Sequence, residues 1–141
     1  MDKSYFEKKS FQAKLENLHE ILLWIRERIS KFFSQRDLDR VELASEEVIV
    51  NIINHAYAKK SGKIAVQVTV NENIEISFMD SGPKFNPISK RRKKIDSLVL
   101  SKRKVGGLGI YIIFNCIDDV EYLRKDKLNI FTLIKKRSLD Y

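Results

Sequence analysis

Apolar residues recur along this chain with two different periods, which divide it into helical and extended segments. From Lys14 to Phe33 and from Asp37 to Ala58 they return every three or four positions, which predicts two amphipathic helices. From Ile64 to Val70 and from Ile74 to Phe78 they alternate with polar residues, on either side of Asn71-Glu72-Asn73. That alternation around a short polar turn predicts a β-hairpin.

Weaker patterns complete the predicted order of elements. They are an edge strand over residues 4–13, a third, apolar helix over 109–117, and two closing strands over 120–124 and 128–135. Tyr5, Phe6 and Phe11 are the candidate core residues of the edge strand, and Asp37 is the expected N-cap of the second helix. The order β-α-α-β-β-loop-α-β-β suits an α+β fold, a two-layer sandwich in which a mixed, mostly antiparallel sheet carries helices on one face.

Length and composition indicate one globular domain spanning residues 1–141. Hydrophobic residues make up 43% of the chain and charged residues 33%, and no apolar run approaches the roughly 18 residues of a transmembrane helix. Cys116 is the only cysteine, so an internal disulfide is excluded, and His19 and His55 do not complete a zinc-ligand cluster with it. Without a signal-peptide pattern, we expect a cytoplasmic protein that does not bind a membrane.

The formal net charge of +8 is concentrated in one segment. Between Lys84 and Lys104, nine basic residues face Asp96 alone, in a predicted loop with a short helical piece around residues 95–100. A nucleic-acid-binding domain more often spreads basic residues over a folded face and interleaves aromatic residues for stacking. Nucleic acid is therefore not the expected partner, and a solvated charge run is the alternative to a functional basic loop.

Glycine and proline are concentrated in the same region, because four of the five glycines and both prolines lie between residues 82 and 109. Glycine permits close approach of the backbone to a ligand, although a surface loop with a turn at each end is the alternative. Gly106, Gly107 and Gly109 open the third helix, where backbone N–H groups and the helix dipole favour a phosphate. The run is neither a Walker A loop nor a full Rossmann fingerprint, since Ile112 stands where the third Rossmann glycine is expected.

Two polar motifs accompany the glycines. Glu47, Asn51 and His55 are four residues apart, so they share one face of an otherwise apolar helix. If these polar side chains are buried, they need hydrogen-bonding partners, which would be found in a site. The alternative is that they form a polar rim of the helix with local hydrogen bonds only. Asp80, followed by Gly82 at a strand end, is the second motif and is also typical of a turn.

The chemistry of these motifs is complementary. Asp80 can accept a hydrogen bond from an exocyclic amine such as that of adenine, and Gly107 and Gly109 can hold phosphates. Asn51 offers an oxygen to Mg²⁺, which takes few protein ligands beside phosphate oxygens and water. Glu47, one turn earlier, is placed to orient or deprotonate an attacking hydroxyl.

The order Glu-x-x-x-Asn, Asp-x-Gly and Gly-Gly-Leu-Gly-Ile resembles the N, G1 and G2 boxes of the GHKL ATPase superfamily. With His55-Ala56-Tyr57 following the first box, the chain is similar over nearly its whole length to the stand-alone anti-sigma factor serine kinases of the RsbW and SpoIIAB type. The resemblance implies a Bergerat-fold sandwich that binds ATP and Mg²⁺, with residues 84–105 as the ATP lid. It also implies a homodimer that sequesters a sigma factor and phosphorylates a serine or threonine of an anti-anti-sigma (STAS) protein.

Residue roles follow from the same resemblance. Glu47 would be the catalytic base, Asn51 the Mg²⁺ ligand and Asp80 the adenine-binding residue. The other residues implied in nucleotide binding are His55, Gly82, Lys84, Gly106, Gly107, Leu108 and Gly109.

Lys84 departs from the pattern, because many relatives have a second glycine in this part of the G1 box. Its cation could assist phosphate binding, or it could mark a pocket adapted to binding without turnover. The alternative hypothesis is therefore a catalytically weak or inactive nucleotide-binding module that acts only by sequestering protein partners.

Overall fold

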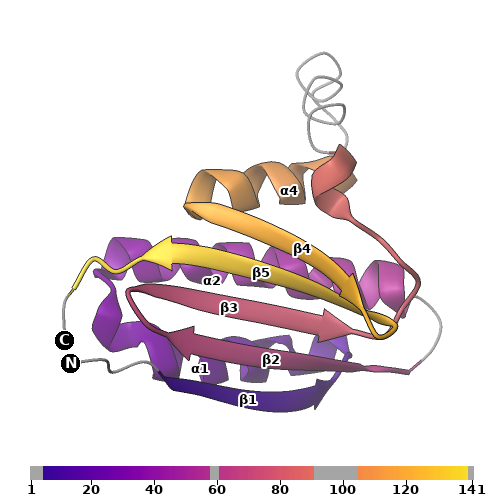
Figure 1. Ribbon diagram of the computed structural model, residues 1–141, viewed down its shortest axis with the longest axis horizontal. Helices are drawn as coiled ribbons and strands as arrows, with labels where there is room; N and C mark the ends of the chain where they lie inside the picture. Colours follow the sequence, from indigo (N-terminus) through magenta and orange to yellow (C-terminus); the bar gives the residue numbers. More distant parts are fainter. Residues whose placement is uncertain (1–4, 58–60, 91–104, 140–141) are drawn as a thin grey trace.

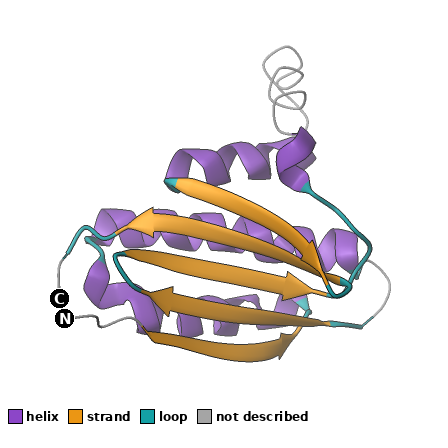
Figure 2. Ribbon diagram, viewed as in Figure 1, coloured by secondary structure: helices purple, strands orange, loops and turns teal. Residues whose placement is uncertain are grey.

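Five antiparallel strands form one sheet, and the helices cover one of its faces (Figures 1 and 2). The computed structural model describes residues 5–57, 61–90 and 105–139. The strands are β1 (Tyr5–Gln12), β2 (Lys63–Val70), β3 (Asn73–Asp80), β4 (Asp119–Lys125) and β5 (Leu128–Lys136), in the spatial order β1-β2-β3-β5-β4. The predicted α+β two-layer sandwich is confirmed. Every strand pair among the described residues is antiparallel, so the sheet is not mixed.

The helical layer contains α1 (Leu18–Ile29), α2 (Gln35–Asn51) and α4 (Val105–Cys116), with short 3₁₀ turns at Leu15–Asn17, Ser30–Phe32 and Pro87–Lys90. A π-helical turn, Ile52–Ala56, continues α2. The prediction that Asp37 caps this helix is wrong. Ser34 is the N-cap, and its hydroxyl accepts a hydrogen bond from the backbone N–H of Asp37 at 3.3 Å. Asp37 is instead in the first turn, where a carboxylate is favoured by the helix dipole.

The core lies between the sheet and the helices and follows the predicted periodicities. On the hairpin, the positions that face the helices are buried and the intervening ones are only partly buried. The edge strand differs from the prediction, because Phe11 is buried whereas Tyr5 and Phe6 are 42% and 63% exposed. Phe6 has the opposite parity to Phe11 and therefore lies on the sheet face away from the helices. Tyr5 has the same parity as Phe11 but stands at the start of an edge strand, which pairs on one side only.

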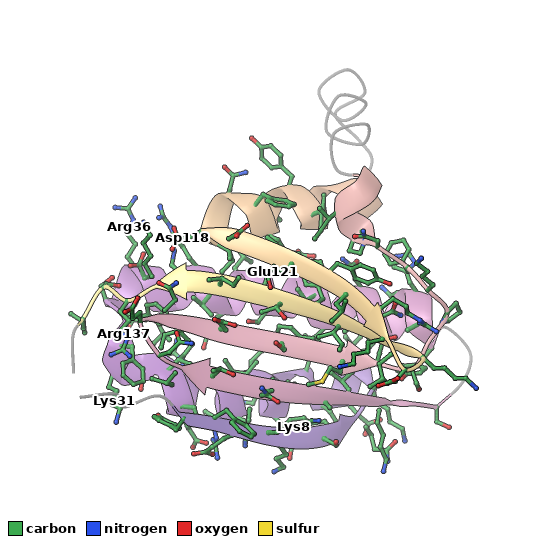
Figure 3. All side chains as sticks on the ribbon, viewed as in Figure 1. Lys8, Lys31, Arg36, Asp118, Glu121 and Arg137 are labelled. Carbon is green, nitrogen blue, oxygen red and sulfur yellow. The ribbon has the colours of Figure 1, made fainter. Side chains whose placement is uncertain are left out.

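Among the described residues, no helix packs on the opposite face of the sheet, which is crossed by a polar row of side chains. By register the row runs from Lys8 through Gln67, Ser77 and Thr132 to Glu121. The hydroxyls of Ser77 and Thr132 are 2.7 Å apart, and Lys8 and Glu121 lie on the two edge strands (Figure 3). The predicted site residues lie on the other side of the sheet or at its end.

The third helix begins earlier than predicted, so Gly106 and Gly107 lie inside the first turn of α4 and do not precede it as a loop. Most of the expected lid, residues 84–105, and the short helical piece expected around 95–100 lie outside the described residues. In the described ranges, no helix is both long enough and apolar enough to cross a membrane.

Candidate functional site

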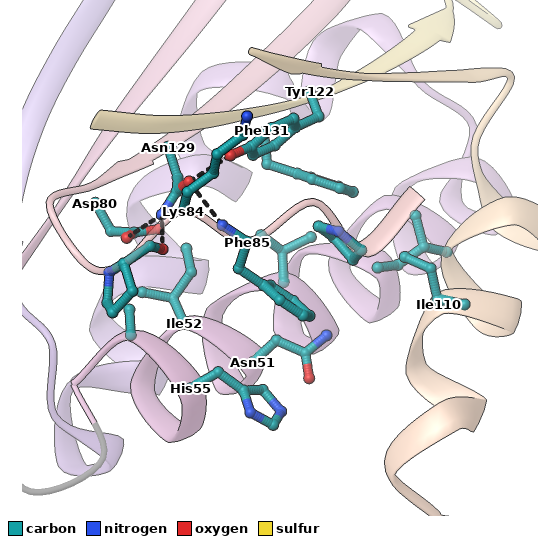
Figure 4. A pocket seen from close by; sticks show the side chains of 15 residues that line it. Asn51, Ile52, His55, Asp80, Lys84, Phe85, Ile110, Tyr122, Asn129 and Phe131 are labelled. Atoms are coloured by element: carbon teal, nitrogen blue, oxygen red, sulfur yellow. Dashed lines mark hydrogen bonds between the residues drawn. The ribbon is translucent and has the colours of Figure 1, made fainter. Parts of the chain in front are cut away.

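A pocket of about 270 Å³ lies where the end of α2 and the start of α4 meet β3, β5 and the loop after β3 (Figure 4). We call it the Asp80 pocket. Its polar lining residues are Asn51, His55, Asp80, Lys84 and Asn129, and most of its wall is apolar. Four of these five belong to the predicted site, so segments distant in the sequence bring predicted residues around one cavity.

Asp80, the last residue of β3, is 6% exposed. Its Oδ1 accepts hydrogen bonds from the backbone N–H of Gly82 at 2.9 Å and from Nδ2 of Asn129 at 3.0 Å. Both bonds end on the same oxygen. Within the part of the chain that the structure describes, Oδ2 of Asp80 therefore keeps its capacity to accept a hydrogen bond from a ligand.

Asn129 is a site residue that sequence reasoning missed. It is 5% exposed on β5, and its Nδ2 also donates to the carbonyl of Pro83 at 2.8 Å. Its Oδ1 accepts from the hydroxyl of Tyr122 at 2.6 Å and from the backbone N–H of Phe85 at 3.2 Å. The one signal available was parity, because Asn129 occupies an inward position of a strand whose other inward residues include the buried Phe131.

Gly82 is required by close packing against the end of α2. A β-carbon at Gly82 would lie 2.5 Å from Cβ and 2.9 Å from Cα of Ala56. The next residue of that segment also holds the loop, because the hydroxyl of Tyr57 accepts from the backbone N–H of Ser81 at 2.8 Å and donates to the carbonyl of Lys63 at 3.0 Å. Ala56 and Tyr57, at the end of the π-helical turn, thus hold the backbone that follows Asp80 in place.

Glu47 lies one turn before Asn51 and does not line the Asp80 pocket. A β-carbon at Gly109 would lie 2.8 Å from Oε2 of Glu47 and 3.7 Å from Nδ2 of Asn51, so α4 approaches both residues through its glycine. Burial raises the pKa of Glu47, and the charge of Glu46 raises it further. A carboxylate with a raised pKa is a stronger base once ionised, which suits proton abstraction.

The start of α4 supplies the remaining predicted residues. Gly106, Gly107 and Leu108 lie in its first turn, whose backbone N–H groups have no acceptor within the helix. Ile110, one residue beyond Gly109, lines the pocket. The positive end of the α4 dipole is therefore next to Asn51, which is a favourable arrangement for an anion.

Lys84 lines the pocket from its exposed side, and Figure 4 shows its side chain extending past Asn129 toward Tyr122. Its ammonium group is thus at the end of the pocket where Asp80 and Asn129 lie. Asn51 and the start of α4 are at the other end.

Comparison with known proteins identifies the family of this chain. A model of the histidine kinase-like ATPase domain matches residues 11–135. The chain belongs to this family. Membership of a histidine kinase-like ATPase family implies the use of ATP in general.

Individual relatives agree with that assignment. The chain is 29% identical over 103 residues to the serine-protein kinase RsbW of Bacillus cereus (strain AH820), covering 70% of this chain and 64% of that protein. It is 28% identical to the protein of the same name from Bacillus thuringiensis (strain Al Hakam), with the same coverage. The chain thus spans less than two thirds of the length of these relatives.

One solved structure has a similar fold. The crystal structure of the RsbU and RsbW domains of Rv1364c from Mycobacterium tuberculosis matches with a TM-score of 0.66 at 15% identity, over 94% of this chain and 32% of that one. At this identity the likeness concerns the histidine kinase-like ATPase fold alone.

Proposed function

We propose that the chain binds ATP with Mg²⁺ in the Asp80 pocket and is a serine/threonine protein kinase of the anti-sigma type. In this proposal it sequesters a sigma factor and phosphorylates an anti-anti-sigma STAS protein in the cytoplasm, as a homodimer. The observation that carries the proposal is the pocket itself, which has a buried carboxylate acceptor at one end and an amide beside a helix N-terminus at the other.

The Asp80 end suits a purine base with an amino group at its edge. Oδ2 of Asp80 accepts from that amine, and Asn129 holds the carboxylate in position through its bond to Oδ1. A carboxylate that accepts from an amine discriminates against a base with a carbonyl at the same position, because the two acceptors would repel each other. Adenine is therefore the proposed base.

The Asn51 end suits the phosphates and Mg²⁺. The described residues contain no group of three or more His, Cys, Asp or Glu side chains that could hold a metal ion alone. One amide oxygen together with phosphate oxygens and water is a normal Mg²⁺ environment, so Asn51 fits this ion. When bound, Mg²⁺ neutralises charge on the phosphate oxygens, and the N–H groups of the first turn of α4 bind the same anionic group.

Glu47 is the proposed base for transfer to a protein hydroxyl. Its carboxylate takes the proton of the serine or threonine as the hydroxyl oxygen bonds to the γ-phosphorus, and ADP leaves with the electrons of the broken P–O bond. The serine-protein kinase name of the curated relatives supports serine as the acceptor.

A second candidate function is a nucleotide-binding module that sequesters partners without turnover. The observation that favours it is the position of Glu47, whose side chain is not part of the pocket lining. Phosphoryl transfer requires the base to reach the acceptor hydroxyl, whereas partner binding does not.

Calorimetric titration with ATP, with and without Mg²⁺, tests the binding proposal. We expect Asp80→Asn to bind ATP more weakly both with and without Mg²⁺. Asn51→Ala should bind ATP like wild type without Mg²⁺ but should gain little affinity when Mg²⁺ is added. Asn54→Ala is the matched control, because Asn54 is exposed on the same segment and does not line the pocket. Equal Mg²⁺ dependence in wild type and Asn51→Ala would remove Asn51 from its proposed role.

Incubation with γ-labelled ATP and a STAS protein separates the two candidate functions. Label on the STAS protein that is lost in Glu47→Ala, with ATP affinity retained, supports the kinase. Glu20→Ala, an exposed carboxylate on α1, should transfer label like wild type. Tight partner binding without any label supports the module.

A further inference from the structure

Two aromatic rings from distant segments are stacked at the Asp80 pocket. The ring centroids of His55 and Phe85 are 5.7 Å apart, with an angle of 27° between the ring planes. Both residues line the pocket, His55 from the π-helical turn after α2 and Phe85 from the loop after β3 (Figure 4). The stack therefore joins two of the pocket's walls.

The backbone that carries Phe85 is held on both sides of the ring. The N–H of Phe85 donates to Oδ1 of Asn129, whose Nδ2 donates to Asp80 and to the carbonyl of Pro83. Just after Phe85, Oδ1 of Asn86 accepts from the backbone N–H of Ile88 at 3.0 Å, a local turn of the kind that asparagine stabilises. Asn129 thus holds both Asp80, the predicted base acceptor, and the backbone of Phe85.

The ligand class follows from this combination. A partly buried phenyl ring offers a flat apolar face, and Asp80 offers a buried acceptor at the edge of the same cavity. A planar heteroaromatic ring with an N–H donor at its edge satisfies both groups at once. A ligand that lacks the ring cannot stack on Phe85, even if it donates a hydrogen bond to Asp80.

We propose that Phe85 is the base-stacking residue of the nucleotide site, and that His55 is a positioning residue that supports the Phe85 ring through the observed stack. This inference rests on the proposed nucleotide-binding function and adds to it a specificity determinant outside the N, G1 and G2 motif residues. His55 acts here through Phe85 and need not touch the ligand.

The test compares a ligand that has a base with one that lacks it. ATP and inorganic tripolyphosphate are titrated against wild type, Phe85→Tyr, Phe85→Leu and Phe85→Ala. We expect Phe85→Leu and Phe85→Ala to weaken ATP binding by about 5- to 150-fold, the range for loss of one aromatic–base stack, and Phe85→Tyr to retain it. Tripolyphosphate binding should be the same in all four proteins. Phe6→Leu is the matched control, since Phe6 is an exposed phenylalanine of β1.

The positioning role of His55 has its own signature. His55→Ala should weaken ATP binding by about two- to tenfold, the range for loss of one aromatic pair, and His55→Phe should restore it. In a Phe85→Ala background, His55→Ala should have no further effect, because the ring that it supports is gone.

The outcomes distinguish the two levels of the proposal. If wild type binds no ATP, the proposed function fails and this inference fails with it. If wild type binds ATP and the Phe85 variants bind it equally well, only the inference fails. Equal losses for ATP and tripolyphosphate would also overturn it, because the ring would then shape the pocket as a whole and not stack on a base.

Discussion

Gly109 approaches Glu47 so closely that a β-carbon on the glycine would lie 2.8 Å from the carboxylate oxygen Oε2. The atom in the way is the end of a flexible side chain, so the carboxylate would move while the helix stayed in place. The same β-carbon would be 3.7 Å from Nδ2 of Asn51, which is an ordinary contact. A side chain at position 109 would therefore displace the proposed base and leave the proposed Mg²⁺ ligand in ordinary contact.

We expect Gly109→Ala to lower phosphoryl transfer at least tenfold, because a displacement of the order of 1 Å at a reacting group has cost about 100-fold in other enzymes. The melting temperature should not fall, since alanine is favoured over glycine in a helix by about 0.5–1 kcal/mol. The affinity for ATP should stay near that of wild type. Thermal melts, ATP titration and label transfer to the STAS protein measure the three quantities, and full transfer activity would contradict the role of Glu47.

Gly82→Ala should behave differently, because the contact there involves backbone. The new β-carbon would be 2.5 Å from Cβ and 2.9 Å from Cα of Ala56. We expect a loss of about 1–3 kcal/mol in the free energy of unfolding, as for other overpacked sites, together with weaker ATP binding. Combining it with Ala56→Gly removes the first clash but not the second, so chemical denaturation should show partial recovery. Complete recovery would mean that the two segments separate more easily than their packing indicates.

The raised pKa of Glu47 predicts a pH-dependent effect on stability. Burial and Glu46 disfavour the ionised form in the folded protein, so the folded state holds the proton to a higher pH than the unfolded chain does. At low pH both states are protonated and the group contributes nothing. As the pH rises above the usual glutamate pKa, ionisation destabilises the fold, and the destabilisation is complete above the raised value.

Glu47→Gln removes this ionisation while keeping the shape of the side chain. The variant should therefore melt at a higher temperature than wild type at neutral pH, and the two should converge as the pH falls below the glutamate range. Melts across a pH series check the sign, with Glu20→Gln at an exposed position of α1 as the control. A difference that grew toward low pH would contradict it. Because Glu47 is the proposed base, the stabilised variant should not transfer label.

The elements of the fold followed from periodicity because burial of one face determines which positions are apolar. The starts of the helices were harder to predict. Asp37 was expected as the cap, but Ser34, which precedes the apolar run by several residues, forms the bond. The first strand was predicted, but Phe6 was wrongly expected in the core, because it has the opposite parity to the buried Phe11 and faces the side of the sheet away from the helices.

The site was predictable where its residues belong to short motifs, as with Asn51 and His55 on one helix and Asp80 at a strand end. Asn51 and His55 share a helix face and line one pocket, as their spacing suggested, whereas Glu47 on the same face lies outside the lining. Asn129 and Phe85 were missed because their role depends on contacts with residues far along the chain, which no local pattern encodes.

Ser45 on α2 carries a last prediction about stability. Its side chain is 0% exposed, and its hydroxyl has no hydrogen-bond partner in the described residues. A buried polar group without a partner costs about 1–3 kcal/mol, and alanine is the better helix former. We expect Ser45→Ala to raise the free energy of unfolding by about 1 kcal/mol, or a melting temperature higher by roughly 2–5 °C.

Ser30→Ala is the control for that substitution. Ser30 is exposed at the end of α1, so its replacement gains little from the removal of a buried hydroxyl. If Ser45→Ala were destabilising, the hydroxyl would have to bond within the native helix, most simply to the carbonyl one turn earlier. ATP binding should be unchanged in both variants, because neither Ser45 nor Ser30 lines the Asp80 pocket.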